Sequence, residues 1–293
     1  MRTLTQVLFA GLALLAVGCS NDGLDSENKS NQLTPVTVHV DGFSVEQESF
    51  ARMTRAVQSL KDYDGVNSIT LAFYQGDTEA YKSTQTKTES DFGEFSLSLP
   101  MGTYTMVVVA YTAKEGSPFV LTSPTEAAYT GDHAYETFTY TQSVTISTND
   151  PIDLSATLSR AIAELKVVSS DGKTDNVTNV RMTFSAGGKS FNPSTGFATI
   201  DTGFANTVGI SAATGAKSTS LSVLFLTTDE QTMDVTIETL DADGNTLFSE
   251  TVNNVPFKRN RVTKLTGDMY TNSKLFGFFK VDTDWLSEEE MNF

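Results

Sequence analysis

The chain has 293 residues, a formal net charge of −16 and one cysteine, Cys19. An acidic chain without a basic patch excludes nucleic acid as an expected partner, and anionic phosphate ligands are unexpected for the same reason. A single cysteine excludes a disulfide within the chain and any cysteine-based metal cage.

Residues 1–18 are interpreted as a signal peptide. Arg2 provides the positive charge, and Val7–Val17 is an apolar run too short to span a bilayer. The run ends in Ala16-Val17-Gly18-Cys19, which resembles the lipobox of bacterial lipoproteins. We therefore predict cleavage before Cys19 and lipidation of Cys19, since several acyl chains on one residue anchor a protein stably. An ordinary signal peptide followed by a chance cysteine is the alternative interpretation.

Residues 19–33 are predicted to form a short flexible tether, because Ser20–Gln32 is polar and almost without apolar residues. About 260 residues follow this tether, enough for two domains of ordinary size.

The mature chain is dominated by a hydrophobic period of two. In the first such segment, Val36, Val38 and Val40 alternate with polar residues, and a strand is predicted over Val36–Val45. The same alternation recurs in residues 69–73, 95–99, 152–158, 161–167 and 233–237. Many short strands separated by turn residues predict an all-β fold of sandwich domains.

Local exceptions and turns refine this pattern. Gln47–Lys61 has apolar residues at helix-like spacing and is predicted to be a short helix or an irregular crossover. Ser170-Asp171-Gly172 and Asp243-Gly244 are predicted to be hairpin turns. Asp241–Asn245 is interpreted as such a turn, not as a calcium loop, because Val252 stands where an EF-hand needs glutamate.

The alternation of residues 152–167 is interrupted at Ser159-Arg160, which predicts a domain boundary there. The predicted domains are an N-terminal β-sandwich over residues 34–158 and a C-terminal β-sandwich over residues 159–293. The second of these includes a C-terminal extension over residues 275–293.

Three stretches taken in order resemble the fimbrillin family, the lipoprotein-derived subunits of type V pili. They are Leu158–Val167, Val255–Asp268, and Leu99–Tyr104 with the strand that follows it to Ala110. The resemblance implies two tandem transthyretin-like β-sandwiches, a role in cell adhesion without catalysis, and other fimbrial subunits as partners. It also implies a location at the cell outer membrane, exposed at the surface. A receptor on a host or bacterial surface is a further expected partner.

The resemblance also implies donor-strand assembly, in which a protease cuts after an arginine, the first strand leaves, and a strand of the neighbouring subunit fills the groove. Arg52 and Arg55 are the candidate processing residues, although ordinary surface arginines are an equal alternative. The candidate donor is Leu275–Trp285, with Leu275, Phe279, Val281 and Trp285 on one face. The alternative is a last strand folded on its own domain.

A second hypothesis is a surface lipoprotein that binds glycans through the exposed aromatic residues Tyr111, Tyr135, Tyr140 and Trp285. No enzyme motif, cofactor or metal site is predicted. The two histidines, His39 and His133, are far apart in sequence and lack companions at ligand spacing.

Overall fold

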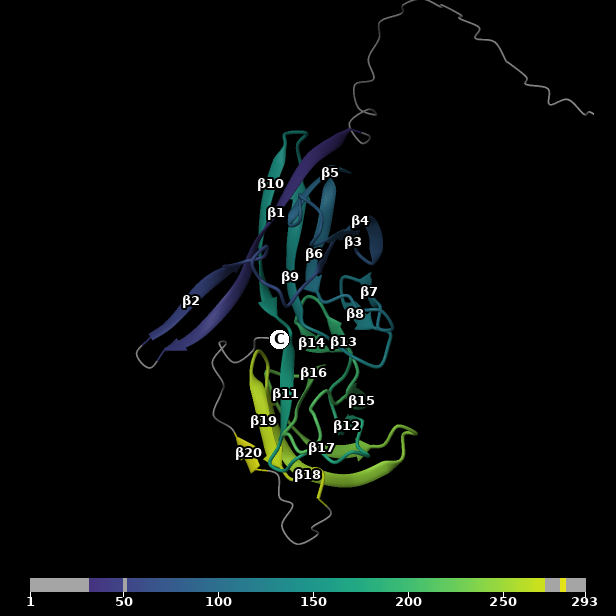
Figure 1. The fold of residues 1–293 in the computed structure, drawn as a ribbon. Coiled ribbons are helices and arrows are strands. Elements are labelled where there is room, and N and C mark those ends of the chain that lie inside the picture. The colour runs from purple at the N-terminus through teal and green to yellow at the C-terminus, as the bar shows by residue number, and fades with distance from the viewer. Residues whose placement is uncertain (1–31, 50–51, 272–279, 283–293) are drawn as a thin grey trace, which may run out of the picture.

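The structure is a computed structural model that describes residues 32–49, 52–271 and 280–282, with side chains described for 32–43 and 59–271. All regular elements in this part of the chain are β-strands. Figure 1 shows two β-rich halves arranged end to end along an elongated molecule. The predicted all-β fold is confirmed.

The N-terminal half contains the first ten strands. They are β1 (Leu33–Ser49), β2 (Arg52–Ser59), β3 (Ser68–Gln75), β4 (Thr78–Thr86), β5 (Glu94–Pro100), β6 (Gly102–Tyr111), β7 (Phe119–Ser123), β8 (Glu126–Tyr129), β9 (Thr137–Ile146) and β10 (Ile152–Arg160).

The C-terminal half contains the remaining ten strands. They are β11 (Ile162–Ser169), β12 (Asn179–Phe184), β13 (Ser190–Asn192), β14 (Phe197–Ala198), β15 (Phe204–Gly209), β16 (Thr219–Phe225), β17 (Glu230–Leu240), β18 (Thr246–Lys258), β19 (Val262–Gly267) and β20 (Lys280–Asp282).

The two halves share one topology. In the N-terminal half, β1 runs parallel to β10 and antiparallel to β5, and β3 lies between β4 and β6. In the C-terminal half, β11 runs parallel to β19 and antiparallel to β16, and β12 lies between β15 and β17. Each half therefore pairs its first strand with its last long strand, which makes the chain a tandem repeat of one sandwich design.

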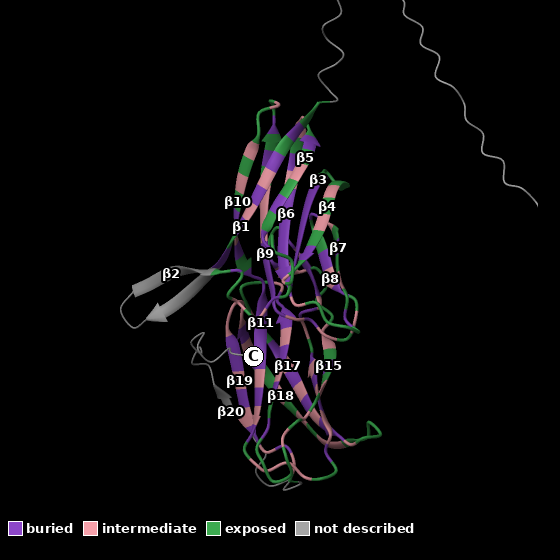
Figure 2. Ribbon diagram, turned by 45° about the horizontal axis from the view of Figure 1, so that its top comes forward, coloured by how far each residue is buried: buried purple, intermediate pink, exposed green. Residues whose placement is uncertain are grey.

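Each half packs two layers of strands around its own apolar core. The N-terminal core takes Val38 from one layer, Leu71 and Val108 from the other. The C-terminal core combines Leu165 with Met182 and Ile237 in the same way. Figure 2 shows the underlying alternation as bands of buried and exposed residues along the strands. This alternation is the hydrophobic period of two seen in the sequence.

A small four-stranded sheet joins the halves. It runs β14-β13-β8-β7, so that β8 of the N-terminal half pairs with β13 of the C-terminal half. Beneath it lies a third apolar cluster in which Phe191 stacks on Phe225 with ring centroids 4.4 Å apart. The halves are thus joined by hydrogen bonds and by a shared core.

The prediction of a helix or irregular crossover over Gln47–Lys61 was wrong. β1 continues to Ser49 and pairs antiparallel with β2, from Gly42↔Ser59 to Ser49↔Arg52. The segment is rich in residues that suit either structure, and the pairing of the two strands decides between them because each supplies backbone partners for the other.

The two predicted hairpin turns differ in outcome. Asp243-Gly244 does connect the paired strands β17 and β18, and Gly244 has φ +83°, which favours glycine. Ser170-Asp171-Gly172 is not a hairpin, because β11 pairs with β16 and β19 and not with β12. The Asp171 carboxylate instead accepts hydrogen bonds from the backbone N–H groups of residues 269–271.

Candidate functional site

The first strand of the chain lies in a groove of the N-terminal sandwich. One edge of β1 pairs with β5 from Leu33↔Pro100 to His39↔Glu94, and its other edge pairs with β10 from Val36↔Ile152 to Phe43↔Leu158. β1 is thus an interior strand, hydrogen-bonded on both sides, although it is the first strand in the described part of the chain. Without it, β5 would lose its strand partner, and β10 would have unpaired backbone groups along the side that β1 occupies.

The inward face of β1 completes the N-terminal core. Val36, Val38, Val40 and Phe43 are each at most 6% exposed. At ~1.5–3 kcal/mol for each fully buried side chain, these four contribute a gross stabilisation of roughly 6–12 kcal/mol. Main-chain hydrogen bonds and side-chain burial together therefore bind β1 in the groove.

Beyond Phe43 the chain leaves the sandwich. A register shift between Val40 and Gly42 bends β1, and from there β1 and β2 form a two-stranded hairpin. Figure 1 shows this hairpin extending away from both halves of the molecule. Arg52 pairs with Ser49 and Arg55 pairs with Glu46, so both candidate processing residues lie on β2, in the projecting hairpin.

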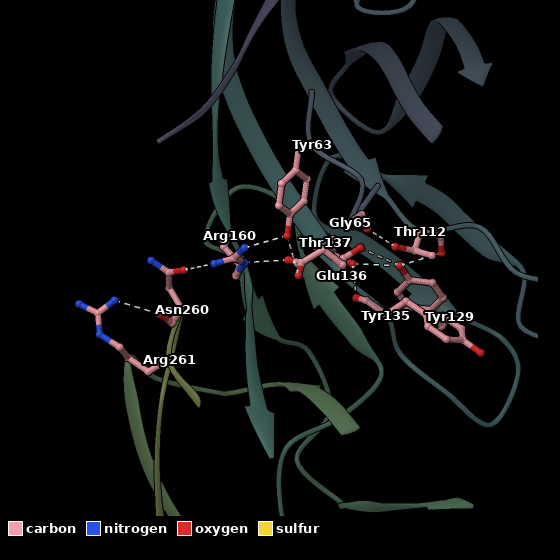
Figure 3. Close-up of polar contacts among 10 residues, drawn as sticks. All are labelled: Tyr63, Gly65, Thr112, Tyr129, Tyr135, Glu136, Thr137, Arg160, Asn260 and Arg261. Atoms are coloured by element: carbon pink, nitrogen blue, oxygen red, sulfur yellow. Dashed lines mark hydrogen bonds and ion pairs between the residues drawn. The ribbon is translucent and has the colours of Figure 1, made fainter. Parts of the chain in front are cut away.

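A buried polar cluster lies at the inner end of the groove (Figure 3). Arg160, the last residue of β10, donates from Nε to Glu136 Oε1 at 2.7 Å and from its terminal nitrogens to Asn260 Oδ1 at 2.7 Å and Tyr63 Oη at 3.0 Å. Tyr63 in turn donates to Glu136 Oε2 at 3.2 Å. The cluster connects both halves of the molecule, since Asn260 lies between β18 and β19.

The cluster is electrostatically coupled. Burial lowers the pKa of Arg160, but attraction to Glu136 and Tyr63 and the hydrogen bonds to both together outweigh this and leave the pKa above its usual range. Burial and the same carboxylate raise the pKa of Tyr63. Glu164 on β11 is 4% exposed, and burial together with repulsion from Glu136 raises its pKa to about 8. The junction therefore holds a charged pair and a carboxyl group that favours its neutral form.

The C-terminal candidate is described in part. Lys280–Asp282 forms β20, which pairs antiparallel with β19, with Val281 opposite Leu265. Leu275, Phe279 and Trp285 lie outside the described residues, as does Cys19. The strand-donor role of this segment stays a prediction.

Three of the aromatic residues of the glycan hypothesis are described, and none is exposed. Tyr111 is 6% exposed and stacks on Phe119 inside the cluster between the halves, while Tyr135 and Tyr140 are partly buried. Trp285 lies outside the described residues. The aromatic platform that would favour this hypothesis is thus not formed by these three tyrosines.

The two histidines make local contacts. His39 Nδ1 contacts Glu94 Oε2 across the β1–β5 ladder, and His133 Nε2 lies 3.0 Å from the backbone oxygen of Thr207. No group of three metal-binding side chains occurs in the described part of the chain. Over the same ranges there is no helix of the length and hydropathy that a membrane span requires.

Sequence reasoning missed the Arg160 cluster. Arg160 was used only as the place where alternation breaks, yet its side chain is buried and pairs with Glu136 from another loop. The available signal was a charged residue at an inward position of a strand, since such residues are rarely buried without a partner. Its partners could not be identified, because they are 24 to 100 residues away along the chain.

Comparisons with solved structures show the fold. A Bacteroides ovatus protein described as a candidate adhesin aligns with a TM-score of 0.52 at 11% identity, covering 87% of this chain and 95% of its own. A Bacteroides thetaiotaomicron protein described as a candidate polysaccharide-binding protein aligns with a TM-score of 0.50 at 9% identity, covering 88% and 99%. The fimbrial anchor protein Mfa2 from Porphyromonas gingivalis gives a TM-score of 0.46 at 9% identity, covering 87% and 99%.

Comparison of the sequence with curated proteins finds no match. The sequence model of one protein family, described as a family of unknown function (DUF6562), matches residues 31–292. This match covers all the described strands of both halves. The chain therefore belongs to the DUF6562 family.

Proposed function

We propose that this protein is a structural subunit of a bacterial surface fimbria that assembles by strand exchange. In this proposal the chain is exported, carries lipid on Cys19 or derives from such a lipoprotein, and is exposed at the cell outer membrane. Its partners are other fimbrial subunits, and its role is cell adhesion without catalysis.

One observation carries the proposal: β1 is both the first strand of the chain and an interior strand of the sheet. Among the described residues, it is joined covalently to the rest of the fold only through the β1–β2 hairpin. A single cut in that hairpin makes β1 a separate strand, held by hydrogen bonds and packing alone. Its removal leaves a groove that is a template for another chain, because main-chain pairing and side-chain pockets are both vacated.

Arg52 and Arg55 are the proposed sites of that cut. Both lie on β2 of the hairpin that extends from the body in Figure 1, and exposed hairpins and loops are preferred sites of proteolysis. A cut after either residue separates β1, and with it Cys19, from the sandwich. Without a cut, β1 stays in its groove and the chain serves as a lipid-anchored subunit.

The proposed donor is the C-terminal segment around Leu275, Phe279, Val281 and Trp285. Its eleven residues, 275–285, reach about 36 Å at ~3.3 Å per residue, enough to span the paired length of β1. The shared fold supports a role in adhesion but not the donor strand itself, since one of the aligned proteins is described as a candidate adhesin. Fold similarity alone does not determine function.

The test is to determine the N-terminus and the mass of the protein recovered from its native cells. A chain that begins at Met53 or Ala56 identifies a polymerising subunit, and deletion of residues 275–293 should then abolish its fibres. A chain that begins at lipid-bearing Cys19 and is recovered with fibres identifies an anchor. A chain that begins at Cys19 and never associates with fibres contradicts the proposal.

A further inference from the structure

The inner end of the groove differs chemically from the rest. Val36, Val38 and Val40 fill the outer positions with small branched side chains, whereas Phe43 fills the last with an aromatic ring. The Phe43 ring lies 4.0 Å from the Phe138 ring and 5.1 Å from the Tyr63 ring, measured between centroids. We call this position the end pocket, and its walls are Phe138 and Tyr63.

Neither wall belongs to β1. Phe138 lies on β9, and Tyr63 follows β2, on the C-terminal side of both Arg52 and Arg55. The two rings also meet each other edge to face, with centroids 5.6 Å apart and an interplanar angle of 86°. Both walls would therefore remain with the body of the protein after a cut in the hairpin.

The Arg160 cluster holds both walls in position. The Arg160 guanidinium lies 4.8 Å from the centroid of Phe138 and donates to the hydroxyl of Tyr63. Glu136 neutralises the guanidinium, and Asn260 ties it to the C-terminal half. None of these named contacts is made by a residue of β1, and the Arg160–Glu136 bond is buried, so they hold the two rings in place when β1 leaves. A site held in place in this way reduces the ordering cost of binding a strand.

We infer that the end pocket is the specificity site of the groove: it selects an incoming strand that presents an aromatic side chain there, and in a second copy of this chain that side chain is Trp285. This inference rests on the proposed strand exchange and adds to it the residue that sets the register. β1 itself shows how such a strand would bind. It runs parallel to β10, and its aromatic residue Phe43 is the last of its residues that pair with β10.

The sequence of the C-terminal segment fits this register. Read in the direction of β1, the four groove positions would take, in order, Phe279, Val281, Thr283 and Trp285. Trp285 follows Thr283 by two positions. In β1, Phe43 follows Val40 by three positions, because the register shift between Val40 and Gly42 adds one residue. The incoming strand would thus need no register shift before its aromatic residue. It would also not continue into a hairpin, as β1 does after Phe43.

The experiment uses the full chain with a specific protease sequence in place of residues 50–51, cut after folding. The β1 fragment is then exchanged against labelled synthetic peptides, and binding is followed by fluorescence anisotropy. The peptides are residues 33–49 and their Phe43→Trp and Phe43→Ala forms, and residues 275–286 and their Trp285→Ala and Phe278→Ala forms. Phe278 is the matched control, because the period of two in a strand would place it on the face opposite Trp285.

We expect Phe43→Trp to be accepted, and Phe43→Ala and Trp285→Ala each to weaken binding by roughly 30-fold or more, as for a buried aromatic anchor. Phe278→Ala should stay within about threefold, a change below 1 kcal/mol. Trp285 is the only tryptophan of the chain, so with Trp285→Phe in the cut full chain the peptide supplies the only tryptophan of the complex. Protection of its fluorescence from a soluble quencher then reports its burial directly.

The outcomes separate the two proposals. If the 275–286 peptide binds and Trp285→Ala binds equally well, the end-pocket inference is overturned while strand donation stands. If the 33–49 peptide rebinds but no form of the 275–286 peptide does, strand donation by this segment is itself overturned. If Phe43→Ala rebinds as tightly as the unchanged peptide, the pocket has no selectivity.

Discussion

At the scale of single residues, the junction between the halves is where charge is buried. Arg160 and Glu136 form an ion pair with side chains 6% and 7% exposed, within a cluster that also satisfies Tyr63 and Asn260. Such a pair adds little stability relative to apolar residues, but an unpartnered charge in its place is costly. The cluster therefore enforces one arrangement of the strands that supply it.

Arg160→Met should lower the free energy of unfolding by about 3–5 kcal/mol, because Glu136 is left as a buried, uncompensated charge. The double variant that also carries Glu136→Leu should recover part of this loss. Urea unfolding of the wild type, both single variants and the double variant measures the coupling between the two residues. Additive effects of the two substitutions would argue against a coupled pair.

Glu164 should make stability depend on pH. Burial and Glu136 raise its pKa from the usual 4.5 to about 8, so between these two pH values the folded chain holds a proton that the unfolded chain releases. Stability therefore falls as pH rises through this window, by up to ~1.4 kcal/mol per pH unit from this group. The groups acting on it are Glu136, Arg160 and Lys166.

Glu164→Gln removes this charge with little change of shape. Its stability advantage over the wild type, measured by urea unfolding at pH 5, 6.5 and 8, should grow with pH. Exposed Glu115→Gln provides the control and should show no such trend. A constant difference between Glu164→Gln and the wild type at all three pH values would contradict the prediction.

At the scale of elements, β1 and the stretch that follows β19 both depend on contacts with distant segments. β1 pairs with β10 across more than 100 residues of sequence, and Asp171 binds residues 269–271, about 100 residues further along the chain. The Asp171 carboxylate accepts bonds of 2.8–2.9 Å from the N–H groups of residues 269–271 and from the Thr271 hydroxyl. It thereby fixes residues 269–271 against the loop that follows β11.

Asp171→Asn should loosen the contact between Asp171 and residues 269–271. Burial raises the pKa of Asp171, but these hydrogen bonds outweigh it and leave the pKa below its usual value. The contribution is therefore present above the unfolded pKa and is lost as pH falls through the folded one. Hydrogen exchange should show faster exchange of the amides of residues 269–271 in the variant at neutral pH, with those of β6 unchanged. Equal protection at residues 269–271 would refute the clamp.

Strands could be predicted where the alternation of apolar and polar residues within one segment was enough to identify them. The alternation of Val36, Val38 and Val40 correctly predicted a strand, because one face of that strand is buried. The segment Gln47–Lys61 was mispredicted, because its spacing also suits a helix and only the pairing of β1 with β2 selects strands. The loop at Asp171 was mispredicted as a hairpin, because its partner is about 100 residues away.

At the scale of the whole molecule, the halves are joined by more than a linker. β8 pairs with β13, Phe191 stacks on Phe225, and Arg160 bonds Asn260 across the junction. Hydrogen bonds, packing and a buried ion pair must therefore break together before the halves can separate. The shared core also predicts that the two halves unfold cooperatively.

Phe191→Ala should uncouple them. Phe191 is fully buried, so its truncation should cost about 3–5 kcal/mol. Calorimetry should record one unfolding transition for the wild type and two for the variant, because the cavity lies between the two sandwich cores. Val120→Ala, at an exposed position of the same small sheet, is the control and should keep a single transition. Two transitions in the wild type would refute the cooperative junction.

By itself, the sequence determined that this is an all-β chain with inward and outward faces, because a strand with one buried face must alternate. Its resemblance to fimbrillins anticipated the tandem arrangement, since each half repeats one order of strands. Only the tertiary structure decided that β1 lies between β5 and β10, that the hairpin extends from the body, and that Arg160 meets Tyr63, Glu136 and Asn260. Those features depend on pairings between residues far apart in the chain, and a local pattern carries no information about which distant segment completes it.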